Sequence, residues 1–200
     1  MTHERRSTDG LFVRNAVLSE GMVIAPIVVC CDTLRKALLL SLAFSCMTVL
    51  TVLIGSFYPR RFPYAVRVVL YALTSAVLYI PTALLCEYVS PDSYAAVHGL
   101  YLPLLSVNSF IVLHSELSFY RMKRGPMLLS LVFHTAGFAF AACAAGFVRE
   151  LLAYGSVAGH IVDMPLVMRM FGTPAGGFVT LSAMCALYRV LTRERGGDAP

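Results

Sequence analysis

The chain has 200 residues, of which 58% are hydrophobic and 14% are charged, and its mean hydropathy is +0.74. A soluble domain with one layered core is less apolar than this, so the composition indicates an integral membrane protein. Lys plus Arg number 16 and Asp plus Glu 11, which gives a net charge of +5. Such an excess fits either nucleic acid or a membrane surface, and the apolar composition favours the membrane. We therefore expect no nucleic-acid binding.

Long apolar runs predict the membrane-spanning helices, because a helix needs about 20 apolar residues to cross a bilayer. Four runs have about this length. One of them, in the fifth predicted span, is interrupted only by His134. Two shorter runs, 21–31 and 99–113, can span only by including polar flanks. We therefore predict one all-α membrane domain over residues 1–200, with six spans. They lie near residues 11–31, 37–57, 66–87, 97–116, 127–150 and 171–190.

The distribution of Lys and Arg between alternate loops predicts the orientation. On one side the six-span topology places 12 of these residues: Arg5, Arg6, Arg14, Arg60, Arg61, Arg67, Arg121, Lys123, Arg124, Arg189, Arg193 and Arg195. On the other side it places four: Arg35, Lys36, Arg149 and Arg169. This bias predicts that both termini are cytoplasmic, and it accounts for the net positive charge without nucleic acid.

The two halves of the chain each contain three predicted spans, so a duplicated half would be inverted relative to its copy. Spans 1 and 4 are then equivalent, both are short, and each contains a proline, Pro26 or Pro103. Paired short segments interrupted by proline indicate helices that break at the membrane midplane. Pro81 in span 3 shows that a proline can also be merely structural. We predict two inverted three-helix repeats, with helices 1 and 4 broken around Ala25-Pro26 and Pro103.

Three stretches of the sequence resemble one family of six-helix membrane subunits. These are residues 15–18 followed by Ala25-Pro26, then 99–116 with Pro103, Asn108 and Glu116, and 146–155 with Arg149-Glu150. A Pro-Ala-Gly-Gly-Phe segment at 174–178 adds to the match. The chain is identified as a member of the Rnf/Nqr family of electron-transport complexes, and it is most similar to the RnfE/NqrD type.

The resemblance implies a bacterial inner-membrane protein that is paired with a homologous subunit of opposite topology and with other Rnf/Nqr subunits. It also implies a [2Fe-2S] cluster at the midplane, to which each of the two subunits gives one Cys from helix one and one from helix four. In such a complex, electron transfer is coupled to movement of Na⁺ or H⁺. We expect this chain to be a non-catalytic or accessory subunit of an ion-motive redox translocase, with no catalytic residues of its own.

The ligand positions of the family depart from its pattern here. Ala25 and Ser109 stand where the resemblance places cysteines, and Val23 stands where it places a glycine. A Cys₄ cluster needs thiolates, which neither alanine nor serine supplies. The six cysteines contain no CxxC pair, so no zinc or disulfide framework is indicated. We therefore expect this chain to bind no metal and no cofactor by itself.

Polar residues inside the predicted spans are candidates for an ion or polar path: Glu20, His134 and Glu116. Glu20 fits an ion path or a buried pair, or packing against a partner. His134 fits a neutral ring bonded to a carbonyl, or a proton relay. Asn108, beside the break in span 4, fits either the bonding of freed backbone groups or the lining of a cofactor niche.

Arg149 and Glu150 end the fifth span, where Arg can extend to the interface and Glu can cap a neighbouring helix. We interpret this pair as fold-defining rather than catalytic. The leading hypothesis is a scaffold or ion-path subunit of an Rnf/Nqr-type complex without iron–sulfur ligands of its own. A small inverted-repeat transporter and a purely structural assembly subunit are the alternatives.

Overall fold

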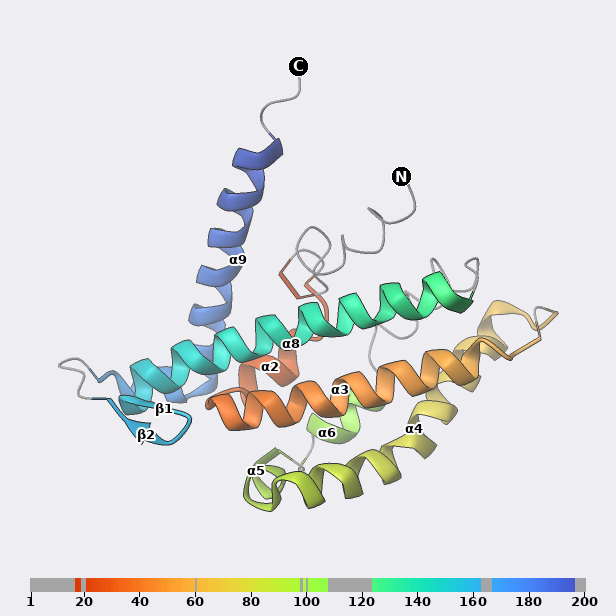
Figure 1. Cartoon of the computed structure of the whole chain (residues 1–200), viewed down its shortest axis with the longest axis horizontal. Helices are drawn as coiled ribbons and strands as arrows, with labels where there is room; N and C mark the ends of the chain where they lie inside the picture. Colours follow the sequence, from red (N-terminus) through yellow and green to blue (C-terminus); the bar gives the residue numbers. More distant parts are fainter. Residues whose placement is uncertain are drawn as a thin grey trace.

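The computed structural model describes residues 17–18, 21–59, 61–97, 99, 101–107, 124–162 and 167–196 (Figure 1). Its α-helices are α2 (Ile24–Cys30), α3 (Leu34–Gly55), α4 (Tyr64–Val89), α5 (Pro91–Val97), α6 (Tyr101–Leu104), α8 (Arg124–Tyr154) and α9 (Pro174–Gly196). Two 3₁₀ helices, η1 (Leu105–Val107) and η3 (Arg169–Gly172), and a hairpin of β1 (Ser156–Val157) with β2 (His160–Ile161) complete the described elements.

Four of the described helices are long and apolar enough to cross a membrane. They are Leu34–Gly55, Tyr64–Val89, Gly125–Tyr154 and Pro174–Thr192. These helices correspond to the predicted spans 2, 3, 5 and 6, and the fifth continues four residues beyond its predicted end. The protein is therefore a mostly helical, multi-pass membrane protein.

The two short predicted spans contain short helices in the described residues. Span 1 contributes the seven-residue α2, and span 4 contributes the four-residue α6 followed by η1. Residues 11–16 and 19–20 of span 1, and 98, 100 and 108–116 of span 4, lie outside the described residues. The six-span count and the repeat therefore stay predictions.

Helix α3 lies at the centre of the packing, between α8 on one side and α4 on the other (Figure 1). Its apolar side chains supply much of the core, including Leu40, Phe44 and Met47, which are fully buried. The Phe44 ring stacks on that of Phe138 in α8, with 3.9 Å between ring centroids. Leu38, Leu50 and Ile54 remain exposed on α3, so α8 and α4 cover only part of its surface.

Helix α9 stands away from the α3 and α8 pair along most of its length (Figure 1). Its buried residues are near its N-terminal end: Gly176, Gly177, Thr180 and Leu181. The hairpin that precedes it was not predicted, since the sequence analysis expected only helices and loops. Its turn residues Ala158 and Gly159 both have positive φ, 53° and 86°, as the tight type I′ turn of a two-residue hairpin requires.

Candidate functional site

The predicted break in span 1 lies at the first turn of α2. Val23 precedes the helix with φ 57° and ψ 33°, in the left-handed region where a β-branched side chain is strained. Pro26 is the third residue of the helix, where its missing N–H would have no intrahelical acceptor. Pro26 is buried, whereas Ala25 is exposed on the protein surface.

The corresponding segment of span 4 also forms a short helix with a proline in its first turn. Pro103 is the third residue of α6, as Pro26 is of α2. The two short helices contact each other, although 70 or more residues separate them in the sequence. The structure thus brings Pro26 and Pro103, the two prolines of the predicted breaks, onto neighbouring elements.

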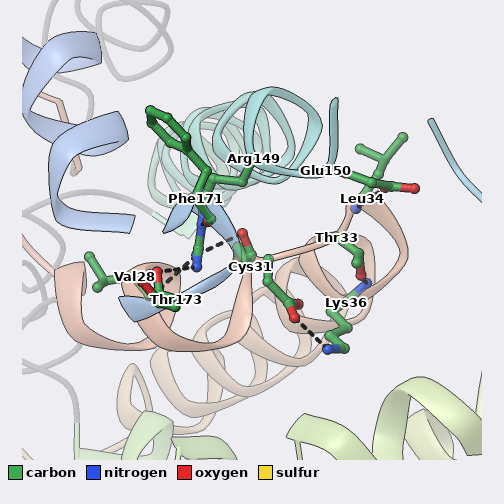
Figure 2. Close-up of polar contacts among 10 residues, drawn as sticks. Val28, Cys31, Thr33, Leu34, Lys36, Arg149, Glu150, Phe171 and Thr173 are labelled. Carbon is green, nitrogen blue, oxygen red and sulfur yellow. Dashed lines mark hydrogen bonds and ion pairs between the residues drawn. The ribbon is translucent and has the colours of Figure 1, made fainter. Parts of the chain in front are cut away.

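Arg149, in α8, directs its side chain into the protein, toward the end of α2. Only 1% of the residue is exposed, so it does not extend to the membrane interface as the sequence analysis allowed. The guanidinium donates four hydrogen bonds to backbone carbonyls of two segments (Figure 2). Their distances are 2.7 Å to Val28, 2.9 Å to Cys31, 2.9 Å to Phe171 and 3.0 Å to Thr173.

The four acceptors explain why the arginine turns inward. Val28 and Cys31 are at the C-terminal end of α2, where the last carbonyls have no intrahelical partner. Phe171 and Thr173 lie where the chain passes from η3 into α9. In an apolar environment an unsatisfied carbonyl is costly, and a planar guanidinium with five N–H donors can satisfy several at once.

Glycine at position 177 lets the start of α9 approach this site. A Cβ built there would be 2.5 Å from the carbonyl oxygen of Val28 and 3.1 Å from Nη1 of Arg149. Any larger residue would therefore push α9 away from α2 and the guanidinium. Arg149 and Gly177 together join α2, α8, η3 and α9 at one point.

The carboxylate of Glu150 accepts hydrogen bonds from backbone N–H groups, as the guanidinium of Arg149 donates them to carbonyls. It is 3% exposed, and its Oε2 accepts a hydrogen bond of 2.8 Å from the N–H of Leu34, in the first turn of α3. Its Oε1 accepts from the N–H of Gly159 at 3.0 Å and from the hydroxyl of Ser156 at 3.3 Å. Glu150 therefore caps a neighbouring helix, as considered from the sequence, and also holds the hairpin.

His134 is buried in α8, with its Nδ1 2.8 Å from the carbonyl oxygen of Ser130. The contact of Phe44 with Phe138 sets the antiparallel register of α3 and α8, and one turn along both helices Thr48 lies at the level of His134. Thr48, Thr51 and Ser75 are fully buried, and within the described chain their hydroxyls have no hydrogen-bond partner. Buried polar side chains thus lie on three helices of the bundle, α3, α4 and α8, and Thr48 and His134 are at the same level.

Four predicted site residues lie outside the described residues: Glu20, Asn108, Ser109 and Glu116. Their predicted roles stay predictions. At the other proposed ligand position, Ala25 presents a methyl group, which does not fit an iron–sulfur cluster because it has no donor atom. Ala25 therefore cannot serve as a ligand of such a cluster.

The hydroxyls of Thr48, Thr51 and Ser75 and the close approach at Gly177 were not predicted from the sequence. The signal for the hydroxyls was present as polar residues inside the second and third apolar runs. The acceptors of Arg149 are backbone carbonyls, which every residue carries, so no side-chain pattern could identify them.

The long apolar helices define a multi-pass membrane protein, and the buried charges that bond backbone ends fix its short helices in place. A family profile described as "Rnf-Nqr subunit, membrane protein" matches residues 5–185, and the chain belongs to this family. It is therefore a membrane subunit of an electron-transport complex, which associates with other subunits of that complex. No curated protein matches the sequence.

Proposed function

We propose that this chain is a scaffold subunit of an ion-translocating Rnf/Nqr-type complex, and that it provides no iron–sulfur ligand itself. The observation that carries the proposal is the site around Arg149, which fixes the segment that bears Ala25 and Pro26 against α8 and α9. All the hydrogen bonds of this site described above go to backbone groups. That is the arrangement of a structural support.

The architecture proposed for the scaffold is six spans in two inverted repeats, with helices 1 and 4 broken at the midplane. Four contacts between elements support it. The first helices of the two halves, α2 and α6, contact each other, and so do the middle helices, α3 and α8. Each short helix also contacts the last helix of the opposite half, α2 with α9 and α6 with α4. Equivalent elements therefore make equivalent contacts, as a two-fold relation between the halves requires.

The partner in this proposal is a homologous subunit of opposite topology. Ala25 is exposed on α2, and α4 and α9 have large exposed apolar side chains. Lipid can cover apolar side chains, but it cannot satisfy the open backbone ends of an interrupted helix. A second protein surface against α2 would satisfy these groups. The proposal places both subunits in the bacterial inner membrane, with both termini of this chain in the cytoplasm.

An ion path through the scaffold would use the buried polar groups of the spans. His134, Thr48, Thr51 and Ser75 are the described members of such a path, and Glu20 and Glu116 are the members expected from the sequence. A buried hydroxyl without a partner costs about 1–3 kcal/mol, so retaining three of them is reasonable where they serve water or an ion. The nature of the ion, Na⁺ or H⁺, stays open.

The absence of cluster ligands is tested by restoring them in the complex. The double variant Ala25→Cys/Ser109→Cys should produce the electron paramagnetic resonance signal of a [2Fe-2S] centre that the unmodified complex and both single variants lack. Cys46→Ser serves as the control, because Cys46 lies in α3, away from the break. A [2Fe-2S] signal in the unmodified complex that is lost in Cys30→Ala or Cys31→Ala would contradict the proposal.

A further inference from the structure

The connection between α8 and α9 exposes apolar side chains at the end of the membrane spans. Ile161, at the end of β2, is 88% exposed, and four further residues are between 41% and 54% exposed: Val162, Val167, Met168 and Met170. We refer to these five residues as the hairpin platform. Exposed apolar side chains gathered in a loop mark an interaction surface, because water alone does not favour their exposure.

The hairpin platform is held firmly to the spans. Oε1 of Glu150 accepts hydrogen bonds from Ser156 and Gly159 of the hairpin. The N–H of Val162 donates to the carbonyl oxygen of Gly155, the residue after α8, at 2.7 Å. The N–H of Met168 donates to the carbonyl oxygen of Leu152, in α8, at 2.8 Å. The exposed side chains are therefore presented on a fixed backbone.

The position of the hairpin platform identifies what it meets. The N-terminal end of α3, the C-terminal end of α8 and the start of α9 all adjoin it, and each belongs to a candidate membrane span (Figure 1). A segment at the end of several spans lies at the depth of the lipid headgroups. Tyr154, the last residue of α8, is 52% exposed there, and tyrosine is enriched at this depth.

Among the described residues around the hairpin platform, the exposed charged side chains are basic. The guanidinium of Arg35 lies beside the turn, since a Cβ built on Gly159 would be 3.4 Å from its Nη2. Arg35 and Arg169 are both exposed, whereas Lys36 is paired with Asp32 at 2.7 Å. Asp163, in the same connection, lies outside the described residues. Exposed apolar and basic side chains together are the pattern of a surface that binds an anionic lipid interface.

We propose that the hairpin platform inserts its apolar side chains into the headgroup region of the bilayer and binds anionic phospholipid through Arg35 and Arg169. This role is separate from the proposed scaffold function, because it depends on lipid and not on the other subunits. It would fix the depth of α3 and α8, whose ends the hairpin joins through Glu150.

The chain contains no tryptophan, so one introduced tryptophan reports on its own surroundings. The full-length Ile161→Trp variant is reconstituted in vesicles of phosphatidylcholine, with bromine placed either near the headgroup end of the acyl chains or near their methyl ends. Its fluorescence should be quenched more by the shallow bromines than by the deep ones. The reference is Val77→Trp, at a position 68% exposed within α4, which the deep bromines should quench more.

Replacing part of the phosphatidylcholine with phosphatidylglycerol should move the Ile161→Trp emission to shorter wavelength. This shift should be lost when Arg35→Gln and Arg169→Gln are added. Emission typical of water that neither brominated lipid quenches would overturn the proposal, because it would leave the surface free for a protein partner. Quenching of Ile161→Trp with the same depth profile as Val77→Trp would also overturn it.

Discussion

At the scale of single residues, Arg149 and Glu150 show how two adjacent charges can stabilise a membrane protein without pairing with each other. The guanidinium satisfies carbonyls at the end of α2 and at the start of α9, and the carboxylate satisfies N–H groups at the start of α3 and in the hairpin. A charge inside the membrane is expensive unless it is bonded, and here each is bonded to backbone groups at or near the ends of helices.

Removing the guanidinium should therefore unfold the site. Arg149→Gln should lower the free energy of unfolding in detergent by roughly 2–4 kcal/mol, because most of the four carbonyls lose their donor. Arg149→Lys should recover only part of this loss, since an ammonium group cannot match the planar fork. Thermal unfolding measures both variants against the exposed Arg169→Gln, and equal stability of Arg149→Gln and the control would contradict the role of Arg149.

A substitution at Val23 is expected to stabilise the protein, because the backbone of this residue is in a conformation that favours glycine. Val23→Gly should raise the free energy of unfolding by about 1 kcal/mol, because the left-handed conformation costs a residue with a Cβ about that much. Val29→Gly, inside α2, should lower it. If both changes destabilise the protein to the same extent in thermal unfolding, the strain at Val23 does not exist.

At the scale of elements, small residues set how closely the helices pack. Gly146 lies on α8 one turn before Glu150, and a Cβ built there would be 2.8 Å from the Cβ of Ala37 and 3.0 Å from the carbonyl oxygen of Thr33. The close contact of α8 with the start of α3, and with it the bond from Leu34 to Glu150, depends on this glycine. Small residues serve this purpose at many helix contacts in membranes.

Gly146→Ala should lower the free energy of unfolding by about 1–3 kcal/mol, because the added methyl group forces α3 and α8 apart. Gly125→Ala on the same helix is the matched control, since its Cβ would meet nothing within 4 Å. Alanine there should leave the stability unchanged or raise it by up to about 1 kcal/mol through helix propensity. Thermal unfolding should show a loss of stability for Gly146→Ala and none for Gly125→Ala, and a Gly146→Ala protein as stable as the unmodified one would refute the close contact.

The elements also show what the sequence could predict. The four long spans were predictable because an uninterrupted apolar run of that length has few other uses. The short helices at Pro26 and Pro103 were indicated by their prolines, but the contact between them is tertiary. The hairpin was not predictable, because its strands have two residues each and its turn has Ala158 where Asn or Asp is usual.

The candidate site was predictable only as a set of residues. Arg149 and Glu150 were interpreted as fold-defining, and the inward direction of Arg149 depends on carbonyls that α2 and α9 bring together from distant parts of the sequence. The buried hydroxyls of Thr48, Thr51 and Ser75 were missed. The sequence alone does not distinguish a hydroxyl that lacks a partner from one that bonds a carbonyl of its own helix.

At the scale of the whole molecule, the chain resembles one part of a larger assembly. Helix α9 stands away from the central pair (Figure 1), α4 exposes apolar side chains, and Ala25 is exposed on α2. Membership of the Rnf-Nqr family makes the chain a subunit of an electron-transport complex. The proposed scaffold role adds that this subunit positions its partners and leaves the cluster ligands to others.

Purification of the tagged, full-length chain from its native membranes in mild detergent, with mass spectrometry of what accompanies it, tests this claim most directly. The account predicts a stoichiometric complex that contains a second Rnf-Nqr membrane subunit together with subunits that carry flavin or iron–sulfur groups. A chain that leaves the membrane alone, folded and free of redox-active partners, would contradict it.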